Sequence, residues 1–257
     1  MRVSETIAEW RLRRREHAGR SIGFVPTMGA LHLGHGSLVE RCRKESDVAV
    51  VSIFVNPTQF NDPADLNRYP RTIEADLRYL ETLGVDDVFF PTQSEMYPHG
   101  YRFRIEPHTG TPIMEGAYRP GFLSGVMTVV LKLLNIVQAD RAYFGEKDYQ
   151  QLRTVREMAE DFFVPTEIVG CATVREKTGL AASSRNALLP PEISGKAPAL
   201  FRALTEGANC EETRAVLVQE GFRVDYVEEY WERRFAAAFL GNVRLIDNVP
   251  LRQTRRK

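Results

Sequence analysis

The sequence lacks the features typical of secreted, membrane-spanning and disulfide-rich proteins. It has only three cysteines in 257 residues, and none of them forms a C-x-x-C pair. An odd number of cysteines without that spacing predicts neither a disulfide framework nor a zinc site, and it indicates a reducing compartment. No apolar run is long enough to cross a bilayer, and the arginine-rich N-terminal stretch has no signal-peptide core. We therefore expect a cytoplasmic protein.

The chain also has no excess charge of either sign. Its 34 basic and 34 acidic side chains give a formal net charge of zero. Because non-specific binding to a polyanion needs a basic surface, we expect no nucleic-acid partner, and the lack of apolar runs predicts no membrane partner. Hydrophobic residues make up 43% of the sequence and charged residues 26%, which are the proportions of an ordinary globular chain.

Between residues 21 and 174, short apolar runs alternate with longer segments of helical periodicity. This alternation predicts an α/β fold, in which crossover helices connect parallel strands. The expected strands are Ser21–Val25, Val48–Val55, Val85–Phe90, Ala142–Phe144 and Thr166–Val169. The expected helices are Gly34–Lys44, Thr72–Leu83, Leu123–Val137 and Asp148–Phe162. The second strand is apolar on both faces, so we expect it in the interior of the sheet.

The pattern changes after Val174. A turn rich in small residues, from Gly179 to Ser184, precedes helical and mixed segments with two further expected strands, Arg223–Glu228 and Val243–Ile246. We interpret this part as a smaller α+β domain. The expected domains are therefore residues 1–173 and 174–257.

The first expected strand leads into the string FVPTMGALHLGH at 24–35. In open α/β sheets, ligands bind at the carboxyl ends of strands, and the start of the following helix presents unpaired N–H groups to a phosphate. Gly29 and Gly34 would allow close approach to the backbone. His32 and His35 could donate hydrogen bonds to phosphate oxygens, or could serve only local loop contacts. A metal site is less favoured, because no third ligand lies nearby in the sequence.

A second loop, NPTQF at 56–60, follows the most apolar strand. Asn56 and Gln59 would face the same edge of the sheet as the two histidines. A neutral amide can hold a carboxylate without weakening it as a nucleophile, which an arginine would do. The alternative is an Asn-Pro turn in which the asparagine caps its own backbone.

A third strand-to-helix passage, FGEKDYQQL at 144–152, carries charged groups. Gly145 would form the turn, Lys147 offers positive charge to a polyphosphate, and Asp148 offers an oxygen ligand to Mg²⁺. Gln151 would follow on nearly the same helix face. Asp148 could equally be a helix N-cap and nothing more.

The fourth string is GLAASSRN at 179–186. Its small residues and hydroxyls suit a loop that closes on phosphates, with Arg185 opposing the charge on a leaving pyrophosphate. A serine-rich linker between domains explains the same string nearly as well.

Together these strings resemble the pantothenate synthetase family, in the superfamily of nucleotidylyltransferase-like proteins whose mark is H-x-G-H after the first strand. The resemblance runs in order along nearly the whole chain, through PTMGALHLGH, FVNPTQF, YPRT, RPG, SGVMTVV, FGEKDYQQL and SSRN. It implies a Rossmann-like parallel sheet with helices on both faces and a smaller C-terminal lid domain. It also implies a homodimer that uses ATP and Mg²⁺ to join pantoate to β-alanine through a pantoyl adenylate, releasing pyrophosphate and AMP.

The resemblance implies roles for individual residues. Catalysis would depend on His32, His35, Lys147 and Arg185. ATP would be bound by Met28, Gly34, Gly145, Lys147, Asp148, Ser183, Ser184 and Arg185, with Asp148 also holding the metal. Pantoate would be bound by Met28, Asn56, Gln59 and Gln151.

Three positions depart from the family pattern. Phe122 stands where a histidine is expected, Ala182 replaces a methionine, and Thr178 replaces an aspartate. The C-terminal domain also looks shorter than is usual in the family. These departures leave open a paralogue that activates a related hydroxy acid or uses another amine. Nucleotidyl transfer to a phosphorylated acceptor and nucleotide binding without turnover are further alternatives.

Overall fold

The computed structural model describes residues 1–108 and 112–251. Within these residues the chain forms two compact units. The first comprises Met1–Glu146 and Gln150–Ala172, and the second comprises Lys147–Tyr149 together with the chain from Thr173 onward. Residues Lys147–Tyr149 therefore belong structurally to the second unit, although the residues on either side of them belong to the first.

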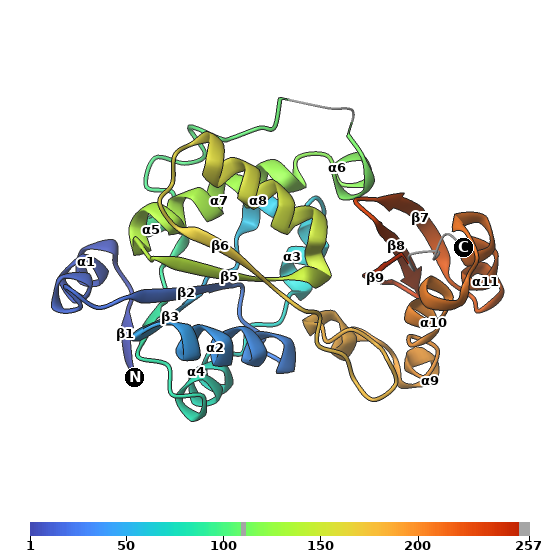
Figure 1. The fold of residues 1–257 in the computed structure, drawn as a ribbon, viewed down its shortest axis with the longest axis horizontal. Coiled ribbons are helices and arrows are strands. Elements are labelled where there is room, and N and C mark those ends of the chain that lie inside the picture. Colours follow the sequence, from blue (N-terminus) through green and yellow to red (C-terminus); the bar gives the residue numbers. More distant parts are fainter. Residues whose placement is uncertain (109–111, 252–257) are drawn as a thin grey trace, which may run out of the picture. The chain divides into compact units, whose positions relative to one another are not determined.

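The first unit contains a six-stranded sheet with the strand order β1-β4-β3-β2-β5-β6 (Figure 1). Every neighbouring pair in it is parallel. The strands are β1 Arg2–Ser4, β2 Ile22–Thr27, β3 Val48–Ile53, β4 Asp87–Phe89, β5 Arg141–Gly145 and β6 Glu167–Cys171. The predicted α/β class is confirmed, and so is the interior position of β3, which is buried along its whole length. β1 was not predicted, because three residues are too few to show a periodicity.

Helices cover both faces of this sheet (Figure 1). The α-helices are α1 Ile7–Glu16, α2 Leu33–Glu45, α3 Pro63–Arg68, α4 Ile73–Thr82, α5 Gln93–Met96, α6 Met114–Tyr118, α7 Phe122–Val137 and α8 Tyr149–Asp161, with 3₁₀ turns at η1 Pro57–Gln59 and η2 Glu146–Asp148. On one face, Leu38 and Val39 of α2 and Leu80 of α4 pack against Val25 and Val51 of the strands. On the other face lie α7 and α8 (Figure 1).

The strand order reverses at β2. From β2 the chain continues to β3 and β4 on one side, whereas β5 and β6 lie on the other side. Ligands of open parallel sheets bind outside the carboxyl ends of the strands at such a reversal. The segments that follow β2 and β5 are the ones that carry H-x-G-H and FGEKD.

The second unit is built on a three-stranded antiparallel sheet with the order β7-β8-β9. Its elements are η3 Ser184–Leu188, α9 Pro191–Ser194, α10 Ala199–Glu206, α11 Cys210–Gln219, β7 Arg223–Tyr230, β8 Arg233–Leu240 and β9 Val243–Pro250. Leu200, Leu204 and Leu217 of the helices pack against Ala236 and Ala238 of β8 in a core of its own. No helix in the described part of the chain is both long and apolar enough to span a bilayer.

Candidate active site

The loop after β2 is held in shape by a buried carboxylate. Gly29 has a φ of +77°, and a Cβ there would lie 3.0 Å from Asp76 Oδ2, so a glycine is required. The backbone N–H groups of Ala30 and Leu31 donate to the Asp76 carboxylate over 2.9 and 2.8 Å. Asp76 lies on α4 and is 3% exposed. This contact fixes the point from which the chain enters α2.

The two histidines cap the start of α2 reciprocally. Gly34 N–H donates to His32 Nδ1 over 3.1 Å, and His32 N–H donates to His35 Nδ1 over 3.3 Å. The two rings lie 4.0 Å apart, centroid to centroid. Because each Nδ1 accepts a hydrogen bond, the proton of each neutral ring is on Nε2. Each ring can therefore donate through Nε2.

The cap also changes how this helix end can bind an anion. The sequence predicts unpaired backbone N–H groups at the start of α2, but those of His32 and Gly34 are bonded to the imidazoles. At these two positions the donors offered to a ligand are ring N–H groups in place of backbone N–H groups.

The loop after β3 contains a buried hydrogen-bond network. Asn56 is 1% exposed, and its Nδ2 donates to Gln59 Oε1 over 3.0 Å and to Gly125 O over 3.2 Å. Its Oδ1 accepts from the Tyr97 hydroxyl and the Thr58 hydroxyl, both over 2.9 Å. Asn56 was predicted to line the acid site. The hydrogen bonds of its side chain are made to other protein groups, and one of these is the predicted site residue Gln59.

Phe122, which stands in place of the expected histidine, supports the same loop. It is the first residue of α7 and is 7% exposed, and the Arg119 guanidinium lies over its ring at 3.7 Å. Arg119 in turn donates to Gln59 O over 3.2 Å and pairs with Glu115 at 3.3 Å. A phenylalanine at 122 therefore stabilises the arginine that holds the Gln59 backbone.

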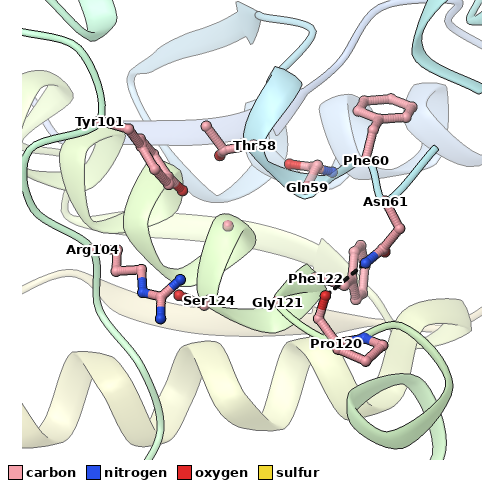
Figure 2. A pocket seen from close by; sticks show the side chains of 11 residues that line it. Thr58, Gln59, Phe60, Asn61, Tyr101, Arg104, Pro120, Gly121, Phe122 and Ser124 are labelled. Atoms are coloured by element: carbon pink, nitrogen blue, oxygen red, sulfur yellow. Dashed lines mark hydrogen bonds between the residues drawn. The ribbon is translucent and has the colours of Figure 1, made fainter. Parts of the chain in front are cut away.

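A cavity of about 140 Å³ adjoins this loop. Figure 2 shows Gln59 on its wall together with Tyr101, Arg104 and Phe122. Of the predicted site residues, Gln59 is the one that lines this cavity.

Two adjacent glutamines at the start of α8 have different surroundings. Gln150 is buried, accepts from Glu115 N–H over 2.9 Å and donates to Ile113 O over 3.0 Å. Gln151, the predicted substrate residue, is half-buried. Gly145 does not need to be a glycine for the turn, since its φ is not positive and a Cβ there would meet no atom within 4 Å. The backbone beside Gly145 is therefore open to close approach.

In the second unit, β9 connects the charged residues. Asn248 Nδ2 donates to Lys147 O over 2.9 Å, and the neighbouring Asp247 pairs with Arg175 at 2.6 Å. The 3₁₀ turn η3, which contains Ser184 and Arg185, packs against the same strand. The Ser183 hydroxyl caps this turn by accepting from Arg185 N–H over 3.2 Å. The unit thus brings Lys147 and the SSRN string to one strand.

Two of the residues that depart from the family pattern lie before that turn. Ala182 is buried and donates its N–H to Val174 O, whereas Thr178 is exposed. Nothing in the structure explains the threonine.

The described residues offer few ligands for a metal. Among residues 1–108 and 112–251, no three His, Cys, Asp or Glu side chains group closely enough to hold an ion. Asp148 has a side chain that is 43% exposed and lies 3.6 Å from Lys147 Nζ. Mg²⁺ commonly binds through one carboxylate plus substrate phosphates, so this single carboxylate fits an ion that arrives with a nucleotide.

Asp76, Tyr97 and Arg119 were not singled out from the sequence, although each is bonded to a predicted motif. Arg119 lies in RPG, one of the strings that carry the family resemblance. Asp76 and Tyr97 have no such signal, because each stands far along the chain from the loop that it contacts.

The comparisons with known proteins agree with the predicted family. The model of the pantoate-β-alanine ligase family matches residues 2–250. The chain belongs to this family. It is 51% identical to the pantothenate synthetase of Bdellovibrio bacteriovorus over 249 residues, which cover 97% of this chain and 99% of that one. It is 46% identical to the pantothenate synthetase of Coxiella burnetii, with 99% of each chain covered.

Solved structures show the same agreement in three dimensions. The crystal structure of pantoate-β-alanine ligase from Francisella tularensis, complexed with β-γ ATP and β-alanine, aligns over 97% of both chains with a TM-score of 0.94 and 42% identity. Pantothenate synthetase from Thermus thermophilus aligns over 97% of this chain and 99% of that one, with a TM-score of 0.89 and 43% identity. Since these ligases are covered almost completely, the C-terminal unit that looks short is shared with them.

Proposed function

We propose that the protein joins pantoate to β-alanine at the expense of ATP, through a pantoyl adenylate. The observation that supports this most is the position of His32 and His35, capped at the start of α2 beside the reversal of strand order, in a ligase-family chain matched over nearly its full length. ATP would place its phosphates against this helix end, where donors and the helix dipole favour negative charge.

In the first half-reaction, the pantoate carboxylate attacks the α-phosphorus of ATP. A bond forms from a carboxylate oxygen to phosphorus, and the bond to the pyrophosphate oxygen breaks. The Nε2–H groups of His32 and His35 donate to phosphate oxygens as negative charge builds up in the transition state. Gly34 and Gly145 allow the nucleotide to lie close to the backbone.

As the sequence resemblance implies, residues of the second unit would also bind phosphate groups. Lys147 and Arg185 oppose the charge of the leaving pyrophosphate, while Ser183 and Ser184 donate to phosphate oxygens. Asp148 would hold Mg²⁺ bound to the phosphates, and the ion supplies further charge neutralisation. These residues lie in the second compact unit, which comprises Lys147–Tyr149 and the chain from Thr173 onward, and the sequence resemblance implies that this unit acts as a lid.

Pantoate would lie between the loops after β2, β3 and β5. Met28 contacts its apolar part, and the amides of Gln59 and Gln151 donate to its oxygens. Neutral donors hold the carboxylate without blunting its attack. In the second half-reaction, the neutral amine of β-alanine attacks the carbonyl carbon of the adenylate, AMP leaves with the bonding electron pair, and the amine loses a proton.

The cysteines indicate the cellular compartment of the protein. The three cysteines, all within the described residues, are free thiols, which supports a reducing compartment such as the cytoplasm. As the sequence resemblance implies, we also propose a homodimer.

The test is the stoichiometry of the complete reaction. Purified protein with ATP, Mg²⁺, pantoate and β-alanine should form AMP, pyrophosphate and pantothenate in equal amounts, and chelation of Mg²⁺ should stop all three. Pyrophosphate release without amine-dependent AMP would indicate nucleotidyl transfer to an acceptor. Turnover only with a different acid or amine would identify a paralogue and overturn the proposal.

A further inference from the structure

The orientation of the Asn56 amide is determined by its backbone neighbours. Gly125 O can only accept a hydrogen bond, and it lies 3.2 Å from Asn56 Nδ2. Thr58 N–H can only donate, and it faces Asn56 Oδ1 at 3.4 Å. If the amide oxygen and nitrogen were exchanged, two acceptors would face each other at Gly125 O and two donors at Thr58 N–H. The nitrogen of Asn56 therefore faces α7, and its oxygen faces the loop.

This orientation also determines how Gln59 is turned. Asn56 Nδ2 has two protons, of which one goes to Gly125 O and the other to the Gln59 side chain at 3.0 Å. The Gln59 atom at that contact must be an acceptor, so it is Oε1. The amide nitrogen of Gln59 is then the end left for a substrate. Gln59 offers a donor, which suits a carboxylate or hydroxyl oxygen.

Tyr97 fixes this arrangement from the other side. Its hydroxyl donates to Asn56 Oδ1 over 2.9 Å. Tyr97 is 8% exposed, and burial raises its pKa to about 12, so the hydroxyl keeps its proton throughout the working pH range. Lys132 Nζ lies 4.7 Å from the centre of its ring and holds the ring in place by a cation–π contact. Tyr97 directly follows α5 and lies outside every predicted motif.

We propose that Tyr97 is a positioning residue that acts through Asn56 to keep the Gln59 amide nitrogen directed at pantoate. The proposal rests on the proposed function, since it assigns the oriented donor to the acid of that reaction. Without the tyrosine hydroxyl, Asn56 Oδ1 keeps the Thr58 hydroxyl as a donor, so the amide is loosened but not lost. The effect should therefore appear in pantoate binding and leave the chemical step largely intact.

The first experiment removes single hydroxyls. Tyr97→Phe should raise the KM for pantoate in pantoate-dependent pyrophosphate exchange by about two- to tenfold, the range expected for one hydrogen bond. kcat and the KM for ATP should stay within twofold. Tyr143→Phe is the matched control, because Tyr143 is also a buried tyrosine and its hydroxyl makes a hydrogen bond to Glu45 at the end of α2 over 3.1 Å, outside the predicted site. The control should leave the KM for pantoate unchanged.

A double-mutant cycle separates positioning from general damage to the fold. If Tyr97 acts through Gln59, Tyr97→Phe should lower kcat/KM for pantoate in the wild-type background and have little further effect in Gln59→Ala. An equal decrease in both backgrounds, or a lower kcat with an unchanged KM, would overturn the positioning role. Absence of pantoate-dependent exchange in the wild-type protein would overturn the proposed function, and this role with it. Exchange with an unchanged KM in Tyr97→Phe would overturn the positioning role alone.

Discussion

The two edges of the parallel sheet both carry buried polar groups, but they use them differently. At the carboxyl edge, His32 and His35 each accept a backbone N–H at Nδ1, so the proton of each neutral ring lies on Nε2, and we propose that these Nε2–H groups donate to phosphate. At the amino edge, His17 uses both ring nitrogens on side chains of the same edge. The histidines at the carboxyl edge thus bond to backbone N–H groups through Nδ1, whereas His17 at the amino edge links side chains through both ring nitrogens.

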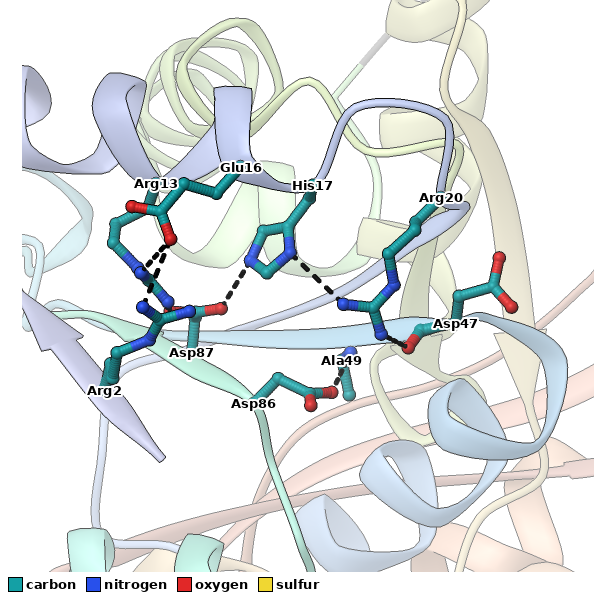
Figure 3. Close-up of polar contacts among 9 residues, drawn as sticks. All are labelled: Arg2, Arg13, Glu16, His17, Arg20, Asp47, Ala49, Asp86 and Asp87. Atoms are coloured by element: carbon teal, nitrogen blue, oxygen red, sulfur yellow. Dashed lines mark hydrogen bonds and ion pairs between the residues drawn. The ribbon is translucent and has the colours of Figure 1, made fainter.

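Figure 3 shows the hydrogen bonds and ion pairs at the amino edge. Asp87, the first residue of β4, is 1% exposed and accepts from Arg13 over 3.1 Å and from His17 Nε2 over 2.7 Å. Arg20 faces His17 Nδ1 at 3.5 Å and donates to Asp47 O over 2.6 Å. Because a guanidinium can only donate, Nδ1 is the acceptor and the His17 proton lies on Nε2, directed at Asp87.

Other aspartates at this edge receive the N–H groups at the beginnings of strands. Ser21 N–H donates to Asp47, Ile22 N–H to Asp140 and Ala49 N–H to Asp86, over 2.9, 2.6 and 2.9 Å. The carboxylates thus satisfy strand ends that the sheet leaves unpaired. Buried polar groups at an edge of the sheet therefore do not by themselves indicate a catalytic site.

The largest effect is expected from a substitution at the carboxyl edge. His35→Ala should lower the rate of adenylate formation by about two to four powers of ten, the range for loss of a preorganised donor to a charged transition state. The fold should persist, as circular dichroism would show. Pantoate-dependent pyrophosphate exchange within a few fold of wild type would contradict the phosphate role of the histidines.

The next largest effect is expected from a substitution at the amino edge. Asp87→Ala leaves the buried His17 without its carboxylate and removes one of the two carboxylates that pair with the half-buried Arg13, so the free energy of unfolding should decrease by about 3–5 kcal/mol. Urea denaturation measures this loss. At a temperature where the variant is folded, its exchange rate should equal that of the wild-type protein, and a loss of activity in the folded variant would contradict the separation of the two edges.

A smaller effect is expected from Asp76, a buried carboxylate that holds the loop at the carboxyl edge. In Asp76→Asn, the amide nitrogen would face a backbone N–H of Ala30 or Leu31, which should cost about 1–3 kcal/mol of unfolding free energy. Unlike Asp87→Ala, this variant should also lose about tenfold in kcat/KM, because the histidine loop is no longer fixed. Loss of stability with full activity would show that Asp76 has only a structural role.

Much of the first unit follows from local sequence. Runs such as VAVVSI and the helical periodicity of 123–137 identify strands and helices to within two or three residues, because burial on both faces leaves a continuous apolar pattern. The strand β8 was missed. Its sequence RRFAAAFL has three alanines, which favour helix, and it is a strand because β7 and β9 pair with it on both sides.

The candidate site is predictable from the sequence only in part. The motif residues follow strand ends, so their common edge could be expected from the α/β alternation. The reciprocal histidine cap, the Asp76 contact and the Tyr97-Asn56-Gln59 chain could not, because they depend on side chains that meet across long sequence separations. The roles assigned to Lys147, Asp148 and Arg185 remain predictions.

The most direct test of the account is pyrophosphate exchange into ATP with pantoate present and β-alanine absent. We predict exchange that requires pantoate and Mg²⁺, because the carboxyl edge activates the acid before any amine binds. A folded protein that binds ATP and yet shows no pantoate-dependent exchange would contradict it.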